Sequence, residues 1–119
     1  MRNDKENIIV TKTEDFALAI IDFTEVIYNM NRSKLANQLF ASGTSIGANV
    51  SEAQNAESKT DFIHKMKIAA KEVDETAYWL RLCKRSIHLP SNQKLSDDLN
   101  EINRIIAKII STSKNDITQ

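Results

Sequence analysis

The chain has 119 residues, and 16 lysines and arginines balance 16 aspartates and glutamates, so its formal net charge is zero. This length fits one domain with its own core, and the neutral balance argues against broad non-specific nucleic-acid binding. The single cysteine, Cys83, excludes an internal disulfide, and no apolar run approaches the roughly 20 residues that span a bilayer. We therefore expect a cytoplasmic protein that makes no membrane contact.

Two glycines and one proline in the whole chain are typical of long helices with few turns. Residues 1–12 are predicted to form a leader or an extended arm. The first helix is predicted to begin near Thr13, an N-cap residue type, and to end by Asn31. Its core stripe has helical spacing and comprises Phe16, Ile20, Phe23, Thr24 and Ile27.

The second helix is predicted to begin near residues 31–33 and to run to about residue 55. Its apolar stripe comprises Leu35, Leu39, Ile46, Val50 and Ala53. Gly43 and Gly47, the only glycines of the chain, lie inside this helix on one flank of the stripe. Because an interior glycine costs about 1 kcal/mol relative to alanine, the pair predicts a close helix contact.

The third helix is predicted to open at Ser58, with Asp61 in the place of the capping-box glutamate. Its apolar stripe is the longest in the chain and comprises Phe62, Met66, Ala69, Val73, Thr76, Leu80, Cys83 and Ile87. Pro90 is expected to end it.

The fourth helix is predicted to start near Ser91, and residues 115–119 are expected to form a flexible tail. Its stripe comprises Leu95, Leu99, Ile102, Ile106 and Ile109. No stretch alternates as a strand would, so the sequence predicts an all-α fold. Helices joined by such short links favour an up-down four-helix bundle over residues 13–114.

Polar side chains flank two of the apolar stripes. On the second helix they are Ser42, Ser45, Asn49 and Glu52, and on the third helix Glu72 and Glu75. Because a buried carboxylate must be paired or hydrogen-bonded, we expect a network of Ser45, Asn49, Glu52 and Glu72 that fixes helix register. A binding site built from the same groups is the alternative.

A second apolar strip on the third helix, Ile68, Trp79 and Leu82, lies well round from the main stripe. A central bundle helix needs a wide apolar face, which is one explanation. An exposed strip of this kind usually marks a protein contact, and we expect these residues to support a homo-oligomer.

Charge is unevenly distributed between helices. The first helix carries Glu14, Asp15, Asp22 and Glu25 with no basic residue up to Asn31, whereas the third is rich in lysine and arginine. These faces are either solvated, or complementary within one chain, or docked head to tail between subunits. Along the third helix, a stripe of His64, Lys67 and Lys71 is a candidate for weak, salt-dependent phosphate contacts.

The residues do not form a recognisable catalytic or metal set. Asp61 and His64 give a single Asp-x-x-His without the second copy that di-iron bundles use. Cys83 lies on an apolar stripe, where a free cysteine is usually a small hydrophobe. We expect no metal, no cofactor and no enzymatic activity.

An ordered set of residues resembles a known family. It comprises Ser42, Ser45, Ile46, Asn49, Glu52 and Ala53, then Ser58 and Phe62, then Ala69, Glu72, Glu75, Trp79 and Leu80. Over residues 8–113 this pattern resembles the four-helix-bundle family named for the 23S ribosomal RNA intervening sequence, some of whose members carry the label S23 ribosomal protein. Val50 and Gln54 depart from its usual residues in ways that should leave the fold intact.

The resemblance implies a small cytoplasmic bacterial bundle that assembles as a homopentameric ring, with no enzymatic activity. A related accessory protein of retroelements has a similar fold and forms a basic barrel that engages nucleic acid. The neutral charge of this chain departs from that relative. Two functions follow as hypotheses: an oligomeric scaffold or adaptor, or an accessory protein associated with RNA or DNA.

Overall fold

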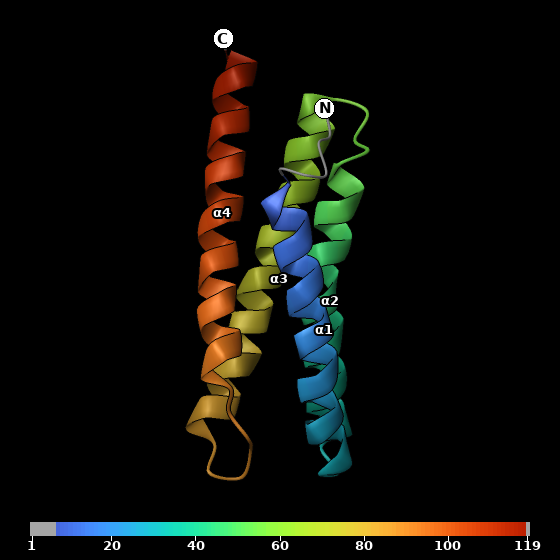
Figure 1. The fold of residues 1–119 in the computed structure, drawn as a ribbon, viewed down its shortest axis with the longest axis vertical. Helices are drawn as coiled ribbons and strands as arrows, with labels where there is room; N and C mark the ends of the chain where they lie inside the picture. The colour runs from blue at the N-terminus through green and yellow to red at the C-terminus, as the bar shows by residue number, and fades with distance from the viewer. Residues whose placement is uncertain (1–6, 119) are drawn as a thin grey trace.

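The computed structural model describes residues 7–118 of the chain, with side chains described up to residue 115. This part is all-α and contains the helices α1 (Ile8–Asn29), α2 (Ser33–Ala53), α3 (Lys59–Arg85) and α4 (Gln93–Thr118), with no strand among the described residues. The helices alternate in direction along an elongated bundle of 51 × 22 × 21 Å (Figure 1). The predicted all-α four-helix fold is confirmed.

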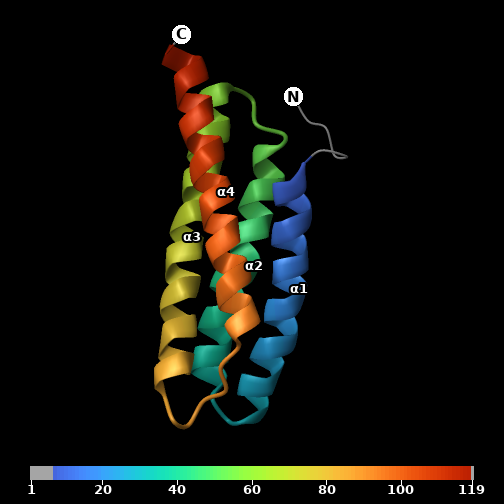
Figure 2. The ribbon, with the colours of Figure 1, turned by 60° about the vertical axis from the view of Figure 1, so that its left-hand side comes forward.

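Each helix packs against two neighbours. The packed pairs are α1 with α2, α2 with α3, α3 with α4, and α4 with α1. Consequently α1 and α3 lie at opposite corners of the bundle, as do α2 and α4 (Figure 2). Since successive helices are antiparallel, α1 and α3 run in the same direction.

The core is built from the predicted apolar stripes. Its most buried large side chains include Ile20, Ile27, Leu39, Ile46, Met66, Ile102 and Ile106. On α3 the prediction was wrong at Ile87, which is 92% exposed. The reason is that α3 ends at Arg85 and Ser86 adopts an extended backbone, so the helical periodicity stops before residue 87.

The start of α3 is capped as predicted. The Ser58 hydroxyl accepts a hydrogen bond from the backbone N–H of Asp61 at 3.0 Å. The Asp61 carboxylate in turn accepts from the backbone N–H of Glu57 at 3.2 Å. The first bond satisfies a donor that a helix N-terminus otherwise leaves open, and the second fixes the residue before the cap, where a capping box would bind the N-cap N–H itself.

The predicted start of α1 and the predicted C-terminal end of α4 were wrong. α1 begins at Ile8, and Thr13 is a buried mid-helix residue whose hydroxyl donates to the Ile9 carbonyl at 2.8 Å. Residues 8–12 are therefore helical because Ile9 extends the core stripe, while residues 1–6 of the predicted arm lie outside the described residues. α4 continues to Thr118, so residues 115–118 of the predicted tail are helical.

Candidate functional site

The glycines of α2 lie against α1. A Cβ atom added at Gly43 would stand 2.8 Å from two side-chain carbons of Ile20. One added at Gly47 would stand 3.2 Å from the backbone carbonyl oxygen of Thr13. The separation at Gly43 is too short for a side chain unless Ile20 shifts, and the one at Gly47 is tight, so α1 and α2 approach each other closely along this run.

The polar strip of α2 is divided between the core and the surface. Ser42 is buried, Ser45 and Asn49 are half-buried, and Glu52 is exposed. The Asn49 amide donates to the Ser45 carbonyl at 2.9 Å, a bond within its own helix. Glu52 reaches α3, where its carboxylate lies 3.7 Å from the Lys65 ammonium.

The predicted network is wrong in its membership. Within the described part of the chain, no side-chain hydrogen bond joins Glu72 to Ser45, Asn49 or Glu52. The buried polar link between α2 and α3 is instead the pair of hydroxyls of Ser42 and Thr76, 3.0 Å apart. The hydrogen bond of Thr76 was not predicted, because its position on the apolar stripe indicates only that the side chain is buried.

Two carboxylates of α3 lie at the surface near α2. Glu75 accepts a hydrogen bond from the indole N–H of Trp79 at 3.1 Å. Glu72 is half-buried, and this burial, reinforced by the neighbouring Glu75 charge, raises the pKa of its carboxyl group above the usual value. Both carboxylates therefore lie at the surface of α3 and not in the core of the bundle.

The candidate phosphate contacts His64, Lys67 and Lys71 are all exposed on α3. Lys67 adjoins Lys114 of α4, and this like charge lowers the pKa of the Lys67 ammonium. Lys114 was not anticipated, because only the packing of α4 on α3 brings two positions so distant in sequence together. The pair concentrates positive charge on the α3–α4 side of an otherwise neutral protein.

The three predicted oligomer contacts share one side of α3. Ile68 and Trp79 are half-buried, whereas Leu82 is 36% exposed. Other large apolar side chains that are more exposed than these were missed as contact candidates. On the helices they are Ile8, Leu18, Ile21, Val26 and Tyr28 of α1, Phe40 of α2 and Tyr78 of α3.

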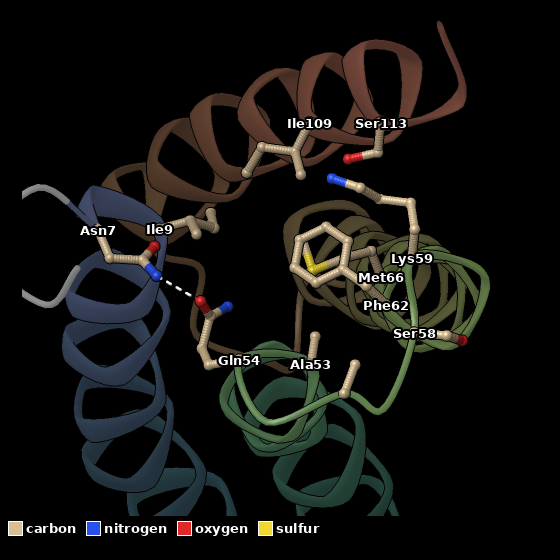
Figure 3. Close-up of a pocket in the computed structure, with 11 residues that line it drawn as sticks. Asn7, Ile9, Ala53, Gln54, Ser58, Lys59, Phe62, Met66, Ile109 and Ser113 are labelled. Carbon is tan, nitrogen blue, oxygen red and sulfur yellow. Dashed lines mark hydrogen bonds between the residues drawn. The ribbon is translucent and has the colours of Figure 1, made fainter. Parts of the chain in front are cut away.

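A cavity of about 350 Å³ lies at the end of the bundle where all four helices contribute (Figure 3). Ile9, Met66, Phe62 and Ile109 form its apolar side, and Asn7, hydrogen-bonded to Gln54, closes another side. The Lys59 ammonium lies 6.0 Å from the centre of the Phe62 ring. No lining residue carries a carboxylate, imidazole or thiol, and the polar groups of the lining include the Lys59 ammonium and the hydroxyls of Ser58 and Ser113.

The remaining reactive groups of the described chain do not converge. Among these residues, no three histidine, cysteine, aspartate or glutamate side chains are grouped as metal ligands would be. Cys83 is buried, and this burial raises the pKa of its thiol above the usual value. Within the described residues, no helix is long and apolar enough to cross a membrane.

The fold and surface define a small all-α bundle with close-packed α1 and α2 and several exposed apolar side chains. The profile of the family described as 23S rRNA-intervening sequence protein matches residues 5–108. The chain belongs to this family, which confirms the resemblance.

A solved structure supports the same assignment. It is a protein of unknown function from the S23 ribosomal protein family of Bacteroides thetaiotaomicron, 37% identical to this chain, with a TM-score of 0.77. The similarity covers 86% of this chain and 97% of that one. No curated protein shows significant similarity to the chain.

The contact at Gly43 predicts a dependence on its partner. Gly43→Ala is expected to destabilise the protein by about 1–3 kcal/mol, because the new methyl group overlaps the Ile20 side chain. In an Ile20→Ala background the same substitution should instead stabilise by up to about 1 kcal/mol, the helix propensity of alanine over glycine. Urea unfolding of the four proteins measures this cycle, and an equal effect in both backgrounds would contradict the contact.

The raised pKa of Glu72 predicts a pH dependence. The folded state holds the Glu72 proton more tightly than the unfolded state, so its contribution to stability is full below the ordinary glutamate pKa. That contribution falls as pH rises through the raised folded pKa. Glu72→Gln should therefore flatten the loss of stability across this window, and Glu75→Gln should do so less, as measured by thermal unfolding at a series of pH values. A Glu72→Gln profile parallel to that of the wild type would refute the assignment.

Proposed function

We propose that the protein is a non-enzymatic oligomeric scaffold or adaptor. The observation that supports this best is the distribution of exposed large apolar side chains. They occur on α1, α2, α3 and the connecting segments, whereas none occurs among the described side chains of α4. Apolar surface concentrated on some helices and not on others is typical of a protein that buries those helices against a partner.

Self-association is the form of the proposal that the chain favours. Its exposed apolar side chains lie on α1, α2 and α3, so each copy offers more than one patch, as the heterologous contacts of a ring use. Membership of the family, together with the sequence resemblance, favours a homopentameric ring. The cavity at the end of the bundle does not argue for catalysis, because no carboxylate or imidazole lines it beside Lys59.

The oligomer is tested by light scattering coupled to gel filtration at micromolar concentration. The expected mass is a multiple of the 13.5 kDa chain. Ile21→Ser combined with Leu82→Ser should shift the protein toward the single chain, since both remove exposed apolar surface. The matched substitution Asn100→Ser on α4 should leave the mass unchanged, and a wild-type monomer would contradict the proposal.

An accessory protein associated with RNA or DNA is the second candidate. The adjoining ammonium groups of Lys67 and Lys114 favour it, because paired unneutralised cations attract phosphate. Fluorescence anisotropy with labelled RNA and DNA at low salt should detect binding that weakens steeply as salt is added. Lys67→Gln should reduce the affinity and the salt dependence, and no binding even at low salt would remove this candidate.

A further inference from the structure

The outer face of α1 combines exposed apolar and acidic side chains. Leu18 is 59% and Ile21 is 40% exposed. Asp22 and Glu25 lie among them, and no lysine or arginine occurs over residues 13–31. We call Leu18, Ile21, Asp22 and Glu25 the acidic α1 face.

The outer face of α3 has the complementary character near its C-terminal end. Tyr78 is 47% and Leu82 is 36% exposed. Arg81 lies against Tyr78, with its guanidinium carbon 5.8 Å from the ring centre, and Arg85 follows one turn later. We call Tyr78, Arg81, Leu82 and Arg85 the basic α3 face. Asp74 and Glu75 precede this face by about one turn.

The fold prevents these two faces from meeting within one chain. α1 and α3 occupy opposite corners of the bundle and do not pack against each other (Figure 2). Intramolecular complementarity between the two helices is therefore excluded. Because α1 and α3 run in the same direction and both faces belong to their C-terminal halves, the faces point away from each other at a similar level of the bundle. A second copy set beside the first brings one against the other.

Apolar surface extends from both faces toward α2. Ile21, Tyr28 and Phe40 line a groove of about 190 Å³ between α1 and α2. On α3, Trp79 lies one turn after Thr76, the residue that meets α2 through Ser42. The basic α3 face reaches the other way as well, since Lys84, between Arg81 and Arg85, donates a hydrogen bond to Gln93 at the start of α4.

The solvent-facing sides of α2 and α4 differ in charge. No charged residue occurs over residues 35–51 of α2, and its exposed positions include Asn37, Phe40, Ala41, Ala48 and Ser51. The outward positions of α4 include the exposed charges Asp97, Arg104 and Lys108. An uncharged face suits the inner wall of a ring, and a charged face suits its outer surface.

We propose that copies of this chain dock head to tail, the acidic α1 face of one against the basic α3 face of the next, and close into a ring with α2 inside. This rests on the oligomer proposed above and adds which surfaces meet. The contact is heterologous, so every copy uses both faces and the ring leaves none unpaired.

Charge reversal tests the contact. Asp22→Lys with Glu25→Lys in one variant, and Arg81→Glu with Arg85→Glu in another, should each reduce the assembly to the 13.5 kDa chain. Combining all these substitutions in one chain should restore the wild-type mass, since the charges are then exchanged. Arg104→Glu with Lys108→Glu on α4 is the matched control and should leave the mass unchanged. All these side chains are exposed, and circular dichroism verifies folding of each variant.

Mixing the two reversed variants tests the direction of the contact. Each variant repels itself but can accept the other on both sides, so an equal mixture should form assemblies with an even number of chains. A wild-type monomer would overturn both this inference and the proposed scaffold. A wild-type oligomer that survives both reversals, or an α4 control that dissociates, would overturn this inference alone.

Spin labels test the orientation of α2. A nitroxide at Ala48→Cys on α2 should give shorter distances between protomers than one at Ser111→Cys on α4, measured by double electron–electron resonance. The native Cys83 is buried with a raised thiol pKa, so it should not take up the label. Equal distances, or shorter ones from α4, would refute the placement of α2 inside the ring.

Discussion

The close approach of α1 and α2 is the constraint on which the rest of the bundle depends. At Gly43 and Gly47 the surface of α2 is bare backbone, and α1 fills the space with Ile20 and the Thr13 backbone. This places the two helices side by side over much of their length. The outer seam between them then carries Ile21, Tyr28 and Phe40 as one continuous surface. The packing that builds the core therefore also shapes a face that is available to a partner.

The polar residues of α2 and α3 make pairwise contacts within and between the two helices. The Ser42 and Thr76 hydroxyls bridge the two helices inside the core. Glu52 reaches Lys65 at the surface. The Ser42, Asn49, Glu52 and Glu75 side chains each contact a partner in their own or the neighbouring helix, so they do not converge on one cluster.

Charged and apolar side chains are distributed unequally among the solvent-facing sides of the helices. α4 presents charges to solvent, while α1 and α3 present apolar side chains accompanied by opposite charges. In the assembly proposed above, burial of apolar area would supply most of the free energy of association, and charge would select the register of docking. A neutral total charge is compatible with both features, because the opposite charges lie on different faces.

The sequence by itself determined the helices, their core stripes and the Ser58 cap, because these depend on periodicity and local hydrogen bonds. It indicated the family through the resemblance of an ordered set of residues. It misplaced the start of α1 and the end of α4, where the signals for a helix end were weak. Only the tertiary structure decided that Thr76 pairs with Ser42, that Lys114 adjoins Lys67, and that α1 and α3 stand at opposite corners. The physical reason is that helical spacing specifies which side of a helix is buried, whereas the neighbour it meets is fixed by how four helices pack together.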